Sequence, residues 1–166
     1  MEHVLRELLI LIDNIFLVFT ALALFASLLV NADNSSRLTL AIWIVGNFCM
    51  DRMTPMMSQT ISSFGQDFRG VWYLIWATCE LSVLYAIWFI HRRFNLNLQS
   101  LAKFVVLCLF SLCALQVFRY FDRDLGLNLL ADVYRYGVLA INISVFPMAC
   151  LWLVRCYVNH YKEAKA

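Results

Sequence analysis

Residues 71–90 read VWYLIWATCELSVLYAIWFI, and Glu80 is the one acidic or basic side chain among them. About 20 apolar residues in helical form are enough to cross the hydrocarbon core of a bilayer. Trp72 and Trp76 lie near the start of this stretch and Trp88 near its end. Such a placement is typical of the aromatic belts at the two membrane surfaces. The stretch therefore predicts a transmembrane helix.

The rest of the chain has the same character. Of its 166 residues, 63% are apolar or aromatic and only 14% are charged, which leaves too little polar surface for a soluble domain. The net charge of +2, without a long basic run, argues against a nucleic-acid partner. We expect an all-α, polytopic membrane helix bundle that forms one transmembrane domain over residues 1–166. The predicted spans are about five, at 7–30, 38–57, 71–90, 101–121 and 127–157.

The second span carries the weakest signal. Its purely apolar part ends at Met50, and Asp51, Arg52 and Pro55 follow. If this stretch is re-entrant, the chain has four true spans and both termini share one side of the membrane. Beyond it, apolar side chains recur every three or four residues, which predicts an amphipathic helix near 57–69. This segment either lies in the membrane interface or extends the second span.

Five spans would put the two termini on opposite sides of the membrane. Six Lys and Arg residues then fall on the N-terminal side and seven on the other side. By the positive-inside rule we expect the N-terminus outside and the C-terminus in the cytoplasm. We expect the location to be a bacterial inner membrane. The expected partners are membrane lipids and either another membrane protein or further copies of this chain.

Polar residues inside the spans gather toward the N-terminal side of the membrane. They recur at helical spacings, so each set shares one face of its helix. Lipid offers such groups no hydrogen-bonding partner. We therefore predict that these faces turn toward one another and enclose an intramembrane polar site, while the other half of the bundle is apolar. The residues predicted for this site are Asp13, Asn47, Asp51, Arg52, Glu80, Gln116, Arg119, Asp132, Arg135 and Asn142.

Glu80 is the most informative of these residues because it lies near the middle of its span. It is either a proton or cation site, or a buried carboxylate that fixes the packing of the helices by pairing. The candidate partners for such a pair are Arg52, Arg119 and Arg135. On a separate face of the same span, Cys79, Ser82 and Ala86 form a run of small residues that predicts close approach of another helix.

Signals for catalysis or for a metal site are missing from the sequence. The three histidines lie at span ends, where we expect them to face the interface or solvent. The six cysteines lie in apolar stretches without a C-x-x-C pair, which is typical of helix packing. No motif of a serine hydrolase, a zinc protease or a phosphate-binding loop occurs. We therefore expect no catalytic residues, no metal and no cofactor.

These observations lead to two main hypotheses for function. The first is a small inner-membrane protein without catalytic activity that acts through partners, as a complex subunit, a regulator or an immunity-type protein. The alternative is an oligomeric channel or a proton- or cation-coupled transporter that uses Glu80 and the polar half of the membrane domain. An intramembrane enzyme is a third and more distant hypothesis.

Overall fold

The computed structural model describes residues 2–30, 32–64 and 69–163, and every regular element in these ranges is an α-helix. The prediction of an all-α bundle with about five long helices is confirmed. The helices are α1 (Glu2–Leu29), α2 (Asn34–Phe64), α3 (Arg69–Arg93), α4 (Ser100–Asp124) and α5 (Ala131–Glu163).

Within the described residues, four helices contain stretches that are long and apolar enough to cross a membrane. These stretches are Leu11–Leu29, Gly70–Arg93, Ser100–Asp124 and Ala131–Lys162. They make the chain an integral membrane protein of the helical type. The helix outside this set is α2, whose second half contains the charged pair Asp51 and Arg52 and several serines.

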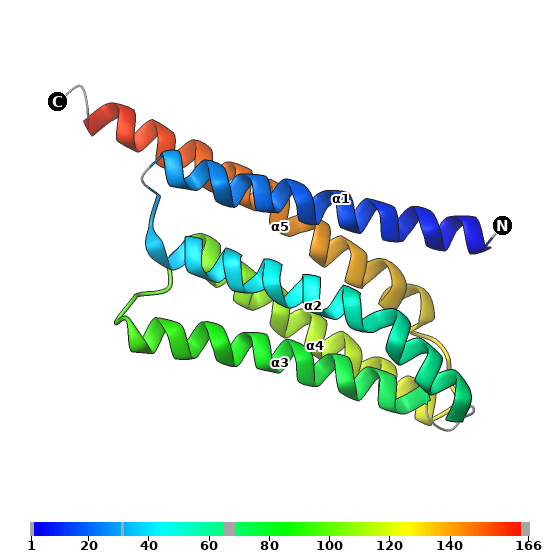
Figure 1. Cartoon of the computed structure of the whole chain (residues 1–166). Coiled ribbons are helices and arrows are strands. Elements are labelled where there is room, and N and C mark those ends of the chain that lie inside the picture. The colour runs from blue at the N-terminus through cyan, green and yellow to red at the C-terminus, as the bar shows by residue number, and fades with distance from the viewer. Residues whose placement is uncertain (1, 31, 65–68, 164–166) are drawn as a thin grey trace.

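Although α2 is the most polar helix, it is continuous over 31 residues and passes through Pro55. At about 1.5 Å per residue it is about 46 Å long. In Figure 1 it lies beside α3 along the length of the bundle. The amphipathic segment predicted near 57–69 is, as far as Phe64, the last part of α2, so the chain adopts the second of the two expected arrangements. Residues 65–68 lie outside the described residues.

Successive helices run in opposite directions, so α1 begins at one end of the bundle and α5 ends at the other (Figure 1). The chain thereby forms two packed groups. α1 packs mainly on α5, while α3 packs mainly on α4 and also contacts α2. α4 joins the two groups, because it packs on α5 as well as on α2 and α3.

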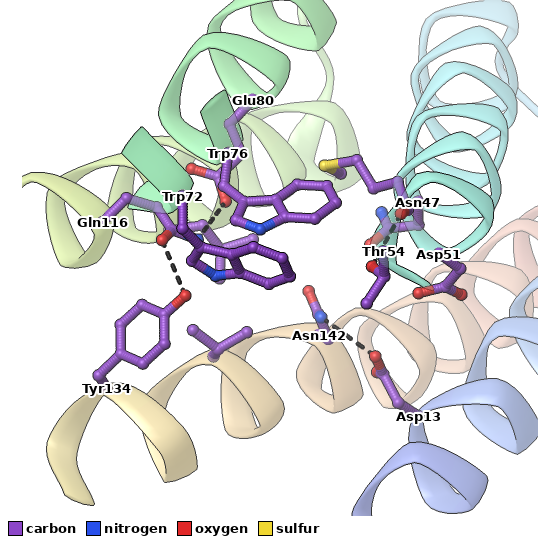
Figure 2. A pocket seen from close by; sticks show the side chains of 13 residues that line it. Asp13, Asn47, Asp51, Thr54, Trp72, Trp76, Glu80, Gln116, Tyr134 and Asn142 are labelled. Atoms are coloured by element: carbon purple, nitrogen blue, oxygen red, sulfur yellow. Dashed lines mark hydrogen bonds between the residues drawn. The ribbon is translucent and has the colours of Figure 1, made fainter. Parts of the chain in front are cut away.

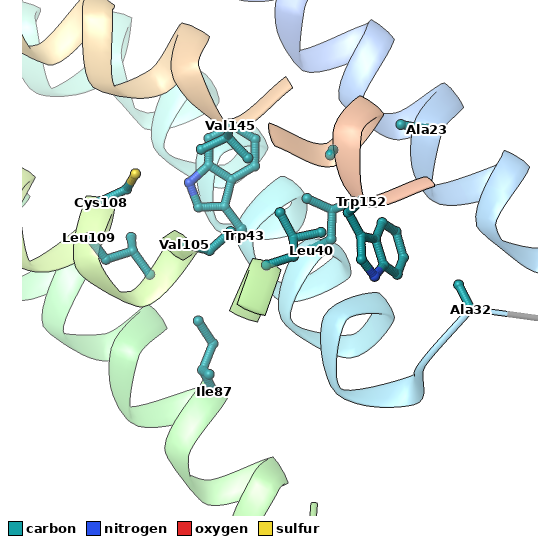
Figure 3. Close-up of a cluster of buried hydrophobic side chains, with 12 residues drawn as sticks. Ala23, Ala32, Leu40, Trp43, Ile87, Val105, Cys108, Leu109, Val145 and Trp152 are labelled. Atoms are coloured by element: carbon teal, nitrogen blue, oxygen red, sulfur yellow. The ribbon is translucent and has the colours of Figure 1, made fainter. Parts of the chain in front are cut away.

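The half of the bundle that contains the C-terminal end of α1 is filled by apolar side chains (Figure 3). Leu40 and Trp43 of α2 and Val145 of α5 are among its buried members. Leu109 of α4 and Ile87 of α3 complete the cluster from the other side. The same half also contains buried polar side chains, namely Ser27, Ser35, Ser36, Thr39 and His91, so it is apolar only in part.

Large apolar side chains also cover the outside of the bundle. Phe25, Leu107 and Leu151 are each more than 60% exposed, on three different helices. In water such a surface would be unfavourable by roughly 25 cal/mol per Å², whereas in a membrane it faces hydrocarbon. The outward distribution of apolar groups thus supports the assignment to a membrane.

At this end of the bundle, Ser35 of α2 bonds both to His91 of α3 and to Gln99, the residue before α4. The Nε2 of His91 lies 2.9 Å from Ser35 Oγ, and its Nδ1 lies 2.8 Å from the carbonyl oxygen of Ile87. Because the carbonyl can only accept, Nδ1 carries the hydrogen in the contact with Ile87. The backbone N–H of Gln99 donates to the same Ser35 oxygen. His91 is 6% exposed, so the expectation of an interfacial or solvent-facing side chain was wrong for it.

The turn between α4 and α5 delays the start of the last helix. Gly126 and Asn128 have positive φ angles of 69° and 55°, which interrupt a right-handed helix. The carboxylate of Asp122 accepts hydrogen bonds from the backbone N–H groups of Leu129 and Leu130, at 2.9 and 3.1 Å. These bonds satisfy donors at the start of α5. The helix therefore begins at Ala131 rather than near residue 127.

At Gly46, α2 lies close to α3. A Cβ atom at this position would lie 2.6 Å from Cγ2 of Val83. We expect Gly46→Val to lower the free energy of unfolding by about 2 kcal/mol, because overpacking of a filled contact displaces both helices. The additional change Val83→Ala is expected to restore much of this loss. Thermal unfolding in detergent measures both, and equal stability of the Gly46→Val variant and the wild type would contradict the prediction.

Candidate functional site

A cavity of about 150 Å³ lies inside the polar half of the bundle, and every one of the five helices contributes to its wall. We call it the central cavity (Figure 2). Six residues that the sequence predicted for a polar site come together here, namely Asp13, Asn47, Asp51, Glu80, Gln116 and Asn142. The remaining lining residues are Met50, Thr54, Trp72, Trp76, Leu112, Tyr134 and Val138.

Glu80 anchors one side of the central cavity through a chain of hydrogen bonds. Its Oε1 accepts from Nε2 of Gln116 at 3.3 Å, and Oε1 of Gln116 accepts from the hydroxyl of Tyr134 at 2.8 Å. The residue is only 3% exposed. Its second oxygen, Oε2, is buried and has no hydrogen-bond partner among the described residues. A buried carboxylate with one oxygen unpaired is unfavourable unless something else occupies that position.

Asn142 plays the corresponding part on the other side of the central cavity. Its Nδ2 donates to Oδ2 of Asp13 at 3.5 Å, which joins α5 to α1. Its Oδ1 is buried and has no partner in the described part of the chain. Asn47 directs its amide to the carbonyl oxygen of Trp43, one turn earlier in α2. The cavity wall therefore presents two unpaired oxygens from different helices, and both are hydrogen-bond acceptors.

Aromatic rings form the remaining wall of the central cavity. The indoles of Trp72 and Trp76 pack edge to face, with centroids 5.3 Å apart. In the view of Figure 2 they stand between the Glu80 group and the side chains of Asp13 and Asn142. Tyr134 is held in place from behind by Tyr73, whose ring is perpendicular to it at 5.4 Å. The faces of such rings carry partial negative charge and attract cations.

The lining of the central cavity is acidic. Asp13, Asp51 and Glu80 contribute three carboxyl groups, and no Lys or Arg is among the described residues that line it. Arg52, which the sequence placed in the site, instead lies over the ring of Phe48 at 5.0 Å. The electrostatic character of the cavity therefore favours positively charged species over anions.

A larger groove adjoins the central cavity between α1 and α2. It has a volume of about 780 Å³, and we call it the α1–α2 groove. Asp13, Asp51 and Thr54 line both spaces, so the two share a boundary at these side chains. The groove continues along α2 to Ser58 and Gln59, near the end of the bundle at which α1 begins. It offers a polar route toward the central cavity from that end.

Four of the predicted site residues lie elsewhere. Arg52 lines the α1–α2 groove, and Asp132 and Arg135 are exposed near the start of α5. Arg119 is buried, but it forms an ion pair with Asp122 and donates to Oδ1 of Asn128 at 2.7 Å. None of the arginines considered as partners for Glu80 is bonded to it, and Gln116 takes that place.

Three aromatic residues of the site escaped the sequence analysis. Trp72 and Trp76 were interpreted as part of an aromatic belt, and Tyr134 was not considered. A signal for Tyr134 was present, because it precedes Asn142 by eight residues and so lies on the same face of α5. Trp76 likewise precedes Glu80 by four residues. Because aromatic residues make up 15% of the chain, their presence on a polar face was not by itself a signal for the site.

The residues of the small-residue face of α3 differ in their exposure. Ser82 is exposed and donates to the carbonyl oxygen of Thr78, while Cys79 and Ala86 are half-buried. The predicted close approach of a helix at this face stays a prediction.

The described residues contain no cluster of side chains suited to coordinate a metal ion. No group of three or more His, Cys, Asp or Glu side chains among these residues could hold a metal ion. The six cysteines are free thiols, none of them in a disulfide. The acidic residues of the central cavity are therefore distributed around its wall rather than gathered at one point.

The chain was compared with protein-family models, with curated proteins and with solved structures. Neither the models of protein families, nor the curated proteins, nor the solved structures contain a match to this chain.

Proposed function

We propose that the chain is a small membrane transport protein that binds a proton or another small cation in the central cavity. The observation that carries the proposal is the position of Glu80, whose unpaired Oε2 is buried among the described residues that line an acidic space. This is the alternative that the sequence left open, in preference to action through partners alone.

The energetic argument concerns the unpaired oxygen. A charged group in the middle of a membrane is unfavourable by roughly 2.5–3.5 kcal/mol on insertion scales, so a purely structural carboxylate should have both oxygens bonded. In the described part of the chain, the Glu80 carboxylate accepts one hydrogen bond, from Gln116. A proton on Oε2, or a cation beside it, removes the charge imbalance. The neighbouring indole of Trp76 favours a cation further, through attraction by the ring face.

Two further features support transport across the membrane. α2 is as long as the bundle, so we propose that it crosses the membrane with the four apolar helices and that the termini lie on opposite sides. The α1–α2 groove then provides access from the N-terminal side, while the apolar half closes the opposite side. On this proposal the N-terminus is outside and the C-terminus cytoplasmic in a bacterial inner membrane. For the cation to leave on the opposite side, the apolar half must change its conformation and open.

The direct test is flux through purified protein. The protein is reconstituted into vesicles that contain a pH-sensitive dye, and a potassium diffusion potential is applied with valinomycin. We expect proton movement faster than in protein-free vesicles, and the same assay with sodium or methylammonium gradients distinguishes among small cations. Rates equal to those of protein-free vesicles under all these gradients would refute the proposal.

Action through a protein partner is a second candidate, favoured by the surface of α3. Tyr85, Trp88 and Phe89 are exposed, and the ring of Tyr85 stacks on Phe89 and lies at a tilt to Trp88. The exposed Ser82 lies one turn before Tyr85. Such a mixed aromatic and small-residue surface suits contact with another membrane helix. Native mass spectrometry after gentle extraction tests this. A second protein in fixed stoichiometry would support the partner hypothesis, and a homo-oligomer or monomer alone would count against it.

A further inference from the structure

A second large groove lies at the opposite end of the bundle from the α1–α2 groove. It has a volume of about 760 Å³ and is bounded by the last turns of α1, the first turns of α2 and the segment after α3. We call it the Arg37 groove. Its walls are apolar side chains, among them Phe25, Leu38, Ala41 and Phe94, and Arg37 is its one charged lining residue among those described.

The side chain of Arg37 is incompletely satisfied. Its Nη2 donates to the carbonyl oxygen of Ser27 at 2.5 Å, but its Nε is buried and has no partner among the described residues. Arg37 also takes part in no ion pair there. A buried guanidinium N–H without an acceptor is rare and indicates that a group is missing from its surroundings.

Asp33, the acidic side chain of this segment, forms no ion pair with Arg37 among the described residues. Asp33 accepts from the backbone N–H of Ser36 at 2.7 Å through Oδ1 and from the indole N–H of Trp152 at 2.8 Å through Oδ2. Both of its oxygens are therefore engaged in capping α2 and in fixing α5. The positive end of the α2 dipole adds to the attraction for an anion at Arg37.

The groove opens to the surroundings of the bundle rather than to its interior. Phe25 and Phe94 are 66% and 64% exposed, so the space between them is accessible from the side. In a membrane protein, a groove on the outer surface of the bundle faces lipid. The Arg37 groove thus combines apolar walls with one positively charged side chain. This combination suits a molecule that has an acyl chain and a negatively charged headgroup.

From these observations we infer that the Arg37 groove binds one anionic glycerophospholipid, with an acyl chain between α1 and α2 and the phosphate against the guanidinium of Arg37. A phosphate beside Arg37 accepts from guanidinium N–H groups in the planar, charge-assisted geometry that arginine favours. Anionic lipids are also concentrated in the cytoplasmic leaflet, which is the side proposed for this end of the bundle. The inference does not depend on transport through the central cavity.

The test is lipid binding measured by native mass spectrometry. The full chain in mild detergent is offered equal amounts of phosphatidylglycerol and phosphatidylcholine with the same acyl chains. We expect one phosphatidylglycerol per chain, preferred by about tenfold, because phosphatidylglycerol keeps a net negative charge beside Arg37, whereas the choline group of phosphatidylcholine cancels the charge of its phosphate. Arg37→Gln retains a donor for the Ser27 carbonyl but is expected to abolish the preference.

Two further variants separate the charge from the groove. Arg93→Gln removes an exposed arginine at the same end of the bundle and should leave the preference unchanged. Ala41→Phe fills the groove while Arg37 stays, and should weaken phosphatidylglycerol binding. The inference fails if Arg37→Gln keeps the preference, if Arg93→Gln loses it to the same extent, or if Ala41→Phe binds as the wild type does. It also fails if millimolar inorganic phosphate displaces the lipid, since the acyl chain would then contribute little.

Discussion

Replacement of Glu80 by Gln is expected to reduce cation or proton flux at least about tenfold, to the level of protein-free vesicles. A glutamine cannot take up a proton, and a cation beside it loses a charged ligand that contributes about 1.5–3 kcal/mol. Because the side chains have nearly the same shape, the amide oxygen of the variant can still accept from Gln116, which lies 3.3 Å from Glu80 Oε1. The measurement is the dye-based flux assay in reconstituted vesicles.

The matched control is Asp132→Asn, another change of an acid to its amide. Asp132 belonged to the polar site predicted from the sequence, but it is exposed on α5 and does not line the central cavity. We expect its flux to equal that of the wild type. The melting temperature of Glu80→Gln in detergent should be unchanged or higher, because the variant removes an uncompensated buried charge. A large loss of stability, with flux absent from both proteins, would favour the structural interpretation of Glu80.

Asp122→Ala is expected to lower the melting temperature in detergent more than Gly46→Val does. Asp122 and Arg119 are buried and form an ion pair, so removal of the carboxylate leaves an uncompensated positive charge. The backbone N–H groups of Leu129 and Leu130 lose their acceptor in the same step, which loosens the start of α5. Thermal unfolding in detergent measures the effect.

Two comparisons identify the cause of this loss. Asp124→Ala removes an exposed acid two residues away and should change stability by less than about 0.5 kcal/mol. The double variant Arg119→Met, Asp122→Ala should be more stable than Asp122→Ala alone, because it also removes the stranded charge. Equal losses for Asp122→Ala and Asp124→Ala would show that the buried contacts of Asp122 contribute nothing.

The helical register of the polar residues could be read from the sequence. Asn47 and Asp51 are four residues apart, so they share a face of α2 whatever the helix packs against. Both line the central cavity. Gln116 was identified in the same way, by its helical spacing from Arg119. Glu80 was identified by its position near the middle of an otherwise apolar span. Burial among other helices follows for them because lipid cannot satisfy polar groups.

Helical spacing does not predict which neighbouring side chain each polar residue contacts. Arg119 is three residues from Gln116, and both were assigned to one polar face. In the structure Gln116 reaches Glu80, whereas the longer Arg119 side chain turns to Asp122 and Asn128 at the end of α4. A long flexible side chain near a helix end has several partners within reach. Which one it takes depends on the loop that folds back over it.

Length and hydropathy are enough to predict a bundle of long membrane helices, since a helix satisfies its own backbone groups in lipid. The position of each polar residue along its span predicts its depth in the same way. The packing of the helices is needed to know which of these residues meet in the central cavity and that Trp72, Trp76 and Tyr134 complete its wall. Periodicity fixes the face of each helix, but the rotation of that face toward its neighbours is set by contacts such as that of Gly46 with Val83.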